Sequence, residues 1–450
     1  MRQLVIVGGS DAGICAALRA KEIAPDVEVT MALADRYPNF SICGLPFFIS
    51  GEVADWRNLA HRSLDEIEAQ GIRVLLEHRV LAIDARQKRV KHAGLDGITH
   101  DLAYDRLLIA TGAVSTKPPI AGLDLPGVFM LRWMEDGLSM HAFMEEHDVQ
   151  SAVVIGGGYI GLEMADALKR RGARVTVVEF AGTLLTTLDD SLGAQLKAEL
   201  ERHGVEVMTG RAVKAVEPCD GGLVVRGDRG LSVTADMVLV AAGCRPAVEL
   251  AKQAGVAIGG SGAIKVDRAM RTNLPDVFAA GDCVETWHNL LGRDVYLPLG
   301  TTAHKQGRVA GENMAGGEAV YAGSLGTQAV KVFDLVAART GLRDREAVDA
   351  GYTPLTVGCE TWDHKVYYPG ARPMQVLITA DVPTRRLLGA QILGHRSAEV
   401  SKRVDIIAAA LFHRMTVEQV SDIDLSYTPP LSSPWDPVQQ AAQAWLKNID

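Results

Sequence analysis

A glycine-rich turn near the middle of the chain has the spacing of a phosphate-binding loop. The segment Gly156-Gly157-Gly158-Tyr159-Ile160-Gly161 follows the apolar run 151–155 and opens an apolar-periodic helix. In such a turn the first glycine permits the bend, the second lets backbone approach a pyrophosphate, and the third lets helix and strand pack. Glu179 lies 179 − 161 = 18 residues further on, where the next predicted strand ends. A carboxylate there binds a ribose 2′-hydroxyl and repels a 2′-phosphate, which favours NADH and leaves NADPH possible.

A second turn of this kind, Gly8-Gly9-Ser10-Asp11-Ala12-Gly13, lies at the N-terminus after the apolar run 4–7. Ser10 replaces the second glycine, but a small residue still permits close approach of a phosphate. The nearest carboxylate after this strand–helix–strand unit is Asp35. It either contacts a ribose or is a surface turn residue. The chain therefore contains two predicted nucleotide-binding folds.

One cysteine has the surroundings of a nucleophile. Cys43 lies in Ser41-Ile42-Cys43-Gly44-Leu45-Pro46, and Pro46 suits the first turn of a helix. We expect Cys43 at or just before a helix N-terminus, where the macrodipole stabilises a thiolate. The alternative is a buried structural thiol, which is how we interpret Cys15, Cys219, Cys244 and Cys359, while Cys283, directly after Asp282, is intermediate between the two. With no CxxC pair and no disulfide or metal-ligand spacing, the six cysteines indicate a reducing, cytoplasmic location and no metal site.

The elements that position these residues alternate between strands and helices. Strand–turn–helix–strand units are predicted at 4–33 and 151–179, and further strands run into glycine turns at 104–112, 236–243 and 273–282. From about residue 324 the pattern changes to alternating strands, a helix at about 399–413 and a Pro-rich tail. We predict an α/β fold with two Rossmann-like dinucleotide-binding domains followed by an α+β domain.

Composition limits the function classes. The chain has 450 residues, 48% of them apolar and 22% charged, with a net charge of −9. This composition is typical of a globular protein and excludes disorder or coiled coil as the main architecture. The acidic balance argues against a nucleic-acid partner. No apolar run reaches the length of about 18–20 residues that a membrane span needs, so we expect no membrane partner.

The chain resembles the pyridine nucleotide-disulfide oxidoreductase flavoproteins over nearly its whole length. The resemblance rests on the two nucleotide folds, the Ala110-Thr111-Gly112 turn and the turn that ends in Asp282. The resemblance implies that residues 1–118 and 246–323 bind FAD, that 119–245 bind NAD(P)H and that 324–450 form a dimerisation domain. It also implies that Asp282 bonds the ribityl chain of FAD. The predicted cofactor-binding residues are Gly8, Ser10, Gly13, Asp35, Ala110, Thr111, Gly112, Gly156, Gly158, Tyr159, Ile160, Gly161, Glu163, Glu179, Gly243, Gly281 and Asp282.

Phe48 stands where a second redox cysteine would be, so the chain resembles the single-cysteine branch of this family. That branch contains coenzyme A-disulfide reductases, persulfide reductases, NADH oxidases and NADH peroxidases. Oxidases and peroxidases carry a histidine in the first glycine turn, and the matching residue here is Asp11, which disfavours the peroxide chemistry. Ile42 replaces a common Asn, and Glu22 replaces a basic residue that helps to hold coenzyme A. These two departures suit a smaller or less anionic substrate and leave its identity open.

Three tyrosines and a histidine complete the predicted catalytic set. Tyr427, Tyr367 and Tyr368 match tyrosine regions that reach the partner subunit's cysteine in the coenzyme A-disulfide and persulfide reductases, which implies a homodimer with a shared active site. A phenol can donate a proton to a leaving thiolate. The alternative for each tyrosine is an amphipathic interface residue. His304 matches a substrate-side histidine or is a helix-surface residue.

The function implied by this resemblance is NADH-linked, FAD-dependent reduction of a disulfide, persulfide or polysulfide through Cys43. Glu163 matches a residue close to the nicotinamide, and Tyr159 matches a side chain that covers the flavin until nicotinamide displaces it. Three alternatives remain open: an NADH oxidase or peroxidase that uses a Cys43 sulfenate, a flavin reductase for a protein partner, and a flavin-bearing sensor.

Overall fold

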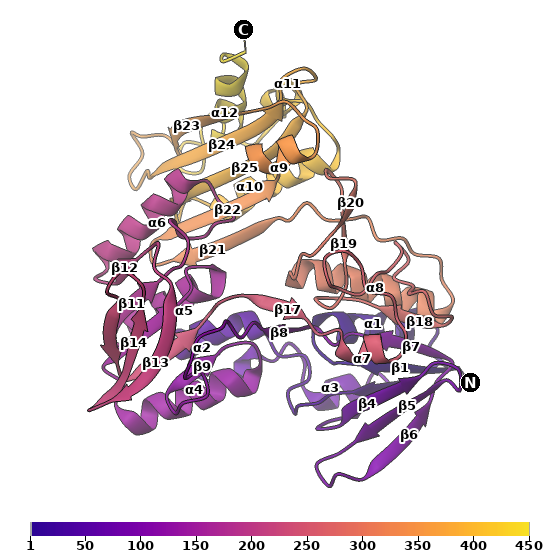
Figure 1. Cartoon of the computed structure of the whole chain (residues 1–450). Coiled ribbons are helices and arrows are strands. Elements are labelled where there is room, and N and C mark those ends of the chain that lie inside the picture. Colours follow the sequence, from indigo (N-terminus) through magenta and orange to yellow (C-terminus); the bar gives the residue numbers. More distant parts are fainter. Residues whose placement is uncertain (1, 450) are drawn as a thin grey trace.

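The two glycine-rich turns each follow the first strand of a parallel βαβ unit in the computed structural model, which describes residues 2–449 (Figure 1). The N-terminal turn belongs to a five-stranded sheet of order β18-β7-β1-β2-β3. These strands are Val277–Ala279, Arg106–Ile109, Gln3–Val7, Glu28–Ala32 and Ile72–Leu75. β1 pairs in parallel register with β2 and β7. The turn therefore opens at the carboxyl edge of the sheet, where open α/β sheets bind ligands.

Helices α1 (Asp11–Ile23) and α8 (Gly300–Ala315) pack against each other on this sheet and share an apolar cluster with it. Their approach is close because Gly307 and Gly311 of α8 face the backbone of Ala12 and Ala16. The remaining elements of this half are α3 (Leu64–Glu68), α7 (Glu249–Gln253), the antiparallel strands β4 (Arg79–Asp84), β5 (Arg89–Ala93) and β6 (Thr99–Ala103), and the hairpin β19 (Thr286–His288) and β20 (Arg293–Val295).

The second glycine turn belongs to another parallel sheet of order β12-β11-β10-β16-β9. Its strands are Glu206–Met208, Arg174–Val178, Ser151–Ile155, Met237–Val240 and Val128–Met130, and its helices are α4 (Met134–His147), α5 (Tyr159–Arg170) and α6 (Asp190–Arg202). An antiparallel sheet of β13 (Val213–Cys219), β14 (Gly222–Gly227) and β15 (Ser232–Ala235) lies beside it. The paired strands β8 (Ala113–Ser115) and β17 (Cys244–Pro246) connect the two halves.

The C-terminal region forms an antiparallel five-stranded sheet of order β21-β22-β25-β24-β23. Its strands are Gln328–Val332, Leu335–Gly341, Leu387–His395, Pro373–Asp381 and Pro354–Trp362, and its helices are α9 (Asp344–Asp349), α10 (Val400–Phe412), α11 (Val417–Ser421) and α12 (Pro437–Leu446). The sequence predicted α10 but placed Pro437 in a tail. Pro437 instead begins α12, because Asp436 caps the helix and proline fits its first turn.

Cys43 lies in the segment that connects β2 to β3 of the N-terminal sheet. It belongs to the 3₁₀ turn η1 (Ile42–Gly44), which runs into α2 (Leu45–Ile49) with Pro46 in its first turn, as predicted. A second 3₁₀ turn, η2 (Trp56–Leu59), follows. Helix α2, helix α5 and the strands β21 and β22 share one apolar cluster, so the Cys43 segment, the second nucleotide fold and the C-terminal sheet are packed together.

The predicted α/β fold with two Rossmann-like units and a C-terminal α+β unit is confirmed by this architecture. The division into residue ranges stays a prediction. Among the helices of residues 2–449, none combines the length and apolar character needed to cross a membrane.

Candidate active site

A cavity of about 540 Å³ lies over the second glycine turn. It is lined by residues from the carboxyl ends of β10, β11 and β16, including Gly156, Gly158, Glu179 and Gly243. Gly156 has φ +114°, and a Cβ on Gly161 would lie 1.9 Å from the Gly156 carbonyl oxygen, so both positions require glycine. A Cβ on Gly158 would meet no atom within 4 Å, because this residue faces open space at the start of α5. This is the cradle that a pyrophosphate needs, with unpaired helix N–H groups at its floor.

Glu179 is fixed at the wall of this cavity. Its two carboxylate oxygens accept hydrogen bonds from the backbone N–H groups of Gly157, at 2.5 Å, and Ala181, at 2.6 Å. Arg211, which the sequence analysis did not select, lines the same cavity. Arg211 follows β12, and the pairing of β12 with β11 brings it to the cavity. No local sequence pattern therefore predicts its position.

The N-terminal turn has the same construction. Gly8 has φ +109°, and a Cβ on it would lie 2.2 Å from the Ala110 carbonyl oxygen. A Cβ on Gly13 would lie 2.0 Å from the Gly8 carbonyl oxygen, while one on Gly112 would meet open space. Ser10 precedes α1 as its N-cap residue and makes no side-chain cap, which leaves the first N–H groups of α1 for another acceptor. These residues fit the FAD that the resemblance implies.

Two further residues of the predicted FAD set, Thr111 and Asp35, have partners within the protein. Thr111 donates its hydroxyl hydrogen to the Ala247 carbonyl at 2.7 Å, next to the β8–β17 connection. Asp35 lies beyond the end of β2, and one of its carboxylate oxygens accepts from the Tyr37 N–H at 2.9 Å. A ribose contact by Asp35 stays a prediction, since this bond is also what a turn residue would make.

Cys43 is exposed but lies among acidic side chains from distant parts of the sequence. Desolvation, and then the charges of Asp11, Glu163 and Asp282, raise the pKa of its thiol, and Arg132 opposes them. The predicted stabilisation of the thiolate by a helix N-terminus stays a prediction, and the surroundings of the sulfur oppose it. η1 and α2 have three and five residues, so their dipoles are short, whereas desolvation and then three carboxylates act on the sulfur.

Arg132 is a second residue that the sequence analysis missed. It lies in the link between β9 and α4, and its Nη2 is 2.5 Å from the Asp282 Oδ2. Its Nε donates to the Ala113 carbonyl at 3.2 Å. Arg132 thus brings a positive charge from the second nucleotide fold to the end of the first, beside Cys43. No motif predicts this, because the partners come from separate sheets.

Helix α5 carries both residues predicted to lie near the nicotinamide. Tyr159 occupies its first position and packs on the shared apolar cluster, and its hydroxyl oxygen accepts a hydrogen bond from the Thr187 hydroxyl at 3.4 Å. Burial raises the pKa of Glu163 to about 7; Lys331 lowers it and Asp166 raises it. Because Glu163 acts on the Cys43 thiol as well, the structure brings the predicted nicotinamide end of the second site next to the predicted nucleophile.

His304 of α8 faces the N-terminal glycine turn. Its Nε2 lies 3.0 Å from the Asp11 Oδ1, and both side chains are partly exposed. The carboxylate that replaces a histidine in the turn thus holds an imidazole supplied by another helix. Arg19 on α1 is neutralised, because Glu22 and Glu312 lie 2.8 and 2.5 Å from its guanidinium.

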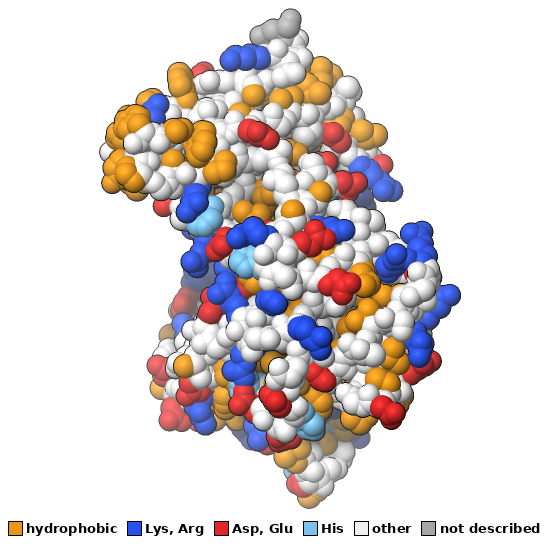
Figure 2. Space-filling model, turned by 90° about the vertical axis from the view of Figure 1, so that its left-hand side faces the viewer, with side chains coloured by type: hydrophobic (Ala, Val, Ile, Leu, Met, Phe, Trp, Pro, Cys, Tyr) orange, Lys and Arg blue, Asp and Glu red, His pale blue; other side chains and the backbone are white. Residues whose placement is uncertain are grey.

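The three predicted catalytic tyrosines are not brought to Cys43 within one chain. Tyr367, Tyr368 and Tyr427 are 73%, 42% and 43% exposed on the C-terminal region, and hydrogen bonding between Tyr367 and Tyr427 puts them side by side. They share that region with the exposed apolar residues Trp362, Val366, Leu431 and Trp435. Figure 2 shows hydrophobic side chains gathered at the upper end of the molecule, where the C-terminal sheet lies. This exposed aromatic surface is what a contact with a second subunit would use.

Two other cysteines share part of this setting, because Asp11 acts on Cys15 and both Arg132 and Asp282 act on Cys244. All six cysteines fall within residues 2–449 and are free thiols. Cys283 is fully buried, and burial raises its pKa to about 11, as it does for Cys15. Thiols with such values carry almost no thiolate at neutral pH, which fits the structural interpretation.

Comparison with known proteins gives a consistent result. The pyridine nucleotide-disulphide oxidoreductase family model matches residues 2–307, and the dimerisation domain of that family matches residues 327–437. A "NAD(P)H sulfur oxidoreductase (CoA-dependent)" of Pyrococcus abyssi is 36% identical over 439 residues, covering 97% of this chain and 96% of the relative. An "NADH oxidase" of Methanocaldococcus jannaschii is 33% identical and covers 99% of each chain. The structure of an NAD-dependent persulfide reductase from A. fulgidus superimposes with a TM-score of 0.95 at 37% identity, over 99% of this chain and 83% of that one.

Proposed function

Because the chain belongs to the pyridine nucleotide-disulphide oxidoreductase family, we propose that it uses NADH to reduce the sulfur–sulfur bond of a small disulfide, persulfide or polysulfide through Cys43. The predicted family is thus confirmed. The enzyme is an FAD-dependent oxidoreductase with NAD(P)H as donor and a sulfur group as acceptor. The free thiols suit a reducing cytoplasm, where we place the protein.

The observation that carries the proposal is the position of Cys43 where the two nucleotide sites meet. Asp11 and Asp282 of the first site and Glu163 of the second all act on its sulfur. FAD, when bound, supplies a carrier that accepts a hydride and gives up two electrons. The pyrophosphate of NADH binds over Gly158 at the start of α5, and Glu179 accepts a hydrogen bond from its ribose.

Cys43 does the sulfur chemistry. Its thiolate attacks one sulfur of the substrate R–S–S–R′, a Cys43–S–S–R bond forms, and R′S⁻ leaves. Two electrons derived from NADH then cleave this mixed disulfide, which restores the thiolate and releases RS⁻. With the protons counted, NADH, one proton and RSSR′ give NAD⁺, RSH and R′SH. The raised pKa of Cys43 means that the thiol needs a proton acceptor, and the Asp11–His304 pair is nearby.

The partner subunit completes the site in this proposal. The exposed tyrosines belong to the matched dimerisation domain, and a homodimer would carry Tyr427 of the partner subunit toward Cys43. There its phenol would donate the proton to the leaving thiolate, with Tyr367 hydrogen-bonded beside it.

Two features limit which nucleotide donor and which sulfur acceptor the enzyme uses. Glu179 is held by two backbone N–H groups and cannot turn away from a 2′-phosphate, so NADH is the preferred donor. The acceptor is less anionic than coenzyme A disulfide, because Glu22 and Glu312 neutralise the Arg19 guanidinium. The relative named as an NADH oxidase favours oxygen reduction at the same cysteine as a second candidate, which the carboxylate of Asp11 disfavours by repelling a sulfenate.

The test is anaerobic NADH consumption with glutathione persulfide, polysulfide and coenzyme A disulfide, and then with oxygen alone, by wild type, Cys43→Ser and Cys219→Ser. Cys219 lies on β13, outside the site, so its variant is the matched control. We expect Cys43→Ser to keep its FAD and its bleaching by NADH and to lose more than 99% of sulfur-dependent turnover. Undiminished sulfur turnover in Cys43→Ser would refute the mechanism, and turnover with oxygen alone would favour the oxidase.

A further inference from the structure

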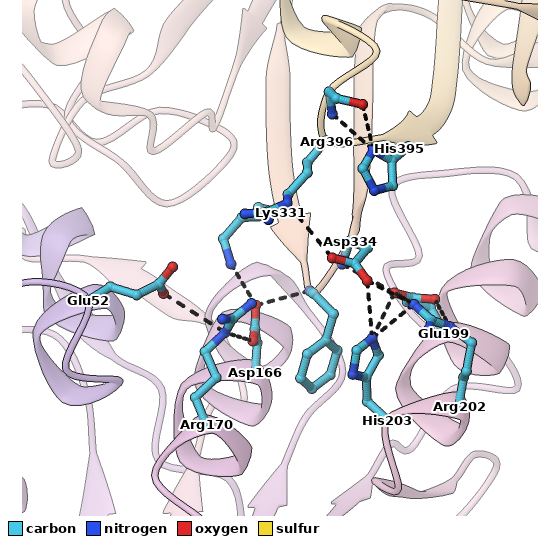
Figure 3. A network of polar contacts seen from close by, with 12 residues as sticks. Glu52, Asp166, Arg170, Glu199, Arg202, His203, Lys331, Asp334, His395 and Arg396 are labelled. Carbon is cyan, nitrogen blue, oxygen red and sulfur yellow. Dashed lines mark hydrogen bonds and ion pairs between the residues drawn. The ribbon is translucent and has the colours of Figure 1, made fainter. Parts of the chain in front are cut away.

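The turn between β21 and β22 reaches from the C-terminal sheet into the second nucleotide fold. Figure 3 shows Lys331 on one side of this turn directed to α5 and Asp334 on the other side directed to α6. Both contacts join residues that are far apart in the sequence. The turn therefore links the dimerisation domain to the helix whose first residues form the NADH cradle.

Asp166 of α5 is the anchor on the first side. It is 3% exposed and accepts from the Lys331 Nζ at 2.7 Å and from the Phe333 N–H at 3.0 Å, both at Oδ2. Its Oδ1 accepts from the Arg170 Nε at 2.6 Å, and Arg170 lies 4.0 Å from Glu52. A buried carboxylate with this many partners fixes where the ammonium group sits.

On the second side of the turn, Asp334 and Phe333 contact residues of α6 and the residue after it. Arg202 Nη2 lies 2.8 Å from Glu199 Oε1, 3.1 Å from Asp334 Oδ2 and 2.9 Å from His203 Nε2. The side-chain atoms of Glu199, His203 and Asp334 have the spacing of a metal site. The Arg202 guanidinium already bonds to all three of them. The His203 ring also stacks on Phe333 at 4.0 Å and 7°. Lys331 is thus placed by contacts on both sides of its turn.

Lys331 also lies over the segment that carries Cys43. Its Nζ is 5.6 Å from the centroid of the Phe47 ring in α2. Glu163 lies one helical turn before Asp166 on the same face of α5. Asp166 from the same helix and Lys331 from β21 change the pKa of Glu163. Glu163 in turn raises the pKa of Tyr159 in α5 and of Cys43 in η1. Lys331 is the one cation in this set.

We propose that Lys331 is a positioning residue, supplied by the dimerisation domain, that fixes the charge of Glu163 at the nicotinamide end of the NADH site. The inference rests on the proposed function only in that Glu163 faces the nicotinamide. Its ammonium group, held by Asp166, favours the carboxylate form of Glu163, which burial and Asp166 disfavour. The C-terminal domain then contributes to the reductive step within the same chain, in addition to any contact across a dimer.

The experiment follows Glu163 in the FAD-loaded enzyme by two readouts. Infrared difference spectra against Glu163→Gln report the ionisation midpoint of this carboxyl group, and stopped-flow flavin bleaching by NADH without any sulfur acceptor gives a pH profile. Lys331→Met is the test variant. Arg170→Met is the matched control, because it too removes a partner of buried Asp166 but Arg170 does not act on Glu163. Lys331→Arg restores the charge.

We expect Lys331→Met to raise the Glu163 midpoint by about one pH unit, the scale on which loss of one neighbouring opposite charge shifts the pKa of a carboxyl group. The bleaching profile moves by the same amount, while Arg170→Met and Lys331→Arg keep the midpoint of wild type. An unchanged midpoint in Lys331→Met, or an equal shift in Arg170→Met, would overturn the proposal. Lys331→Gln, which can keep a hydrogen bond to Asp166, answers the same question if Lys331→Met does not fold. None of these readouts depends on sulfur turnover.

Discussion

Gly158→Ala and Gly161→Ala should separate nucleotide binding from folding, although the two glycines lie in the same turn. Gly158 has φ −84° and ψ −172°, which alanine adopts freely, and its new methyl group would meet no protein atom within 4 Å. At a helix N-cap, alanine loses a few tenths of a kcal/mol relative to glycine, and the stiffer unfolded chain offsets this. The free energy of unfolding should therefore change by less than about 0.5 kcal/mol.

The same methyl group would occupy the space that the pyrophosphate of NADH needs. Loss of one charge-assisted hydrogen bond costs about 1.5–3 kcal/mol, which is about a 10- to 150-fold rise in Kd. In Gly161→Ala the new Cβ would lie 1.9 Å from the Gly156 carbonyl oxygen, so α5 must move away from the turn. Overpacking of this kind costs about 1–3 kcal/mol in stability in addition to the lost affinity.

The assay pairs calorimetric titration with NADH and thermal unfolding of the FAD-loaded enzyme without NADH. Gly182→Ala is the control, since this exposed glycine has open space around it and lies outside the residues that line the cavity. Unchanged NADH affinity in Gly158→Ala would refute the assignment of the cradle. A loss of stability in Gly158→Ala equal to that in Gly161→Ala would show that the open space is not there.

Two further predictions concern charge and stability. The pKa of Glu163 is raised from 4.5 to about 7 in the folded protein, so the protonated side chain favours folding below pH 4.5 and this contribution is lost as pH rises through 7. Glu163→Gln should therefore stabilise the protein above pH 7, by up to about 3 kcal/mol, and give no gain at pH 4.5. Denaturant unfolding as a function of pH measures this difference. Arg403→Met should destabilise the protein by about 3–5 kcal/mol, because the guanidinium lies 3.2 Å from buried Asp436 and its removal leaves this carboxylate without a cation. The double variant with Asp436→Asn should recover part of the lost stability. An Arg403→Met variant as stable as wild type in denaturant unfolding would contradict the prediction.

Features that depend on neighbouring residues follow directly from the amino-acid sequence. The glycine turns at 8–13 and 156–161 follow local rules, because a tight bend, an approaching phosphate and a close helix–strand contact each exclude a side chain at a fixed position. Glu179 was predictable for the same reason, since the length of one helix sets its distance from the turn. Pro46 marked the start of α2 after Cys43.

The charges that surround the reacting atoms come from segments that are brought together by folding. Asp11, Glu163, Asp282 and Arg132 act on Cys43 from four segments. Desolvation, followed by the three carboxylates, raises the pKa of its thiol, against the shift predicted from a short helix. Lys331 comes to α5 from the C-terminal sheet, and no spacing in the sequence encodes that approach. Electrostatic effects depend on distance in space and on burial, so a linear pattern that places a nucleophile correctly cannot give its protonation state.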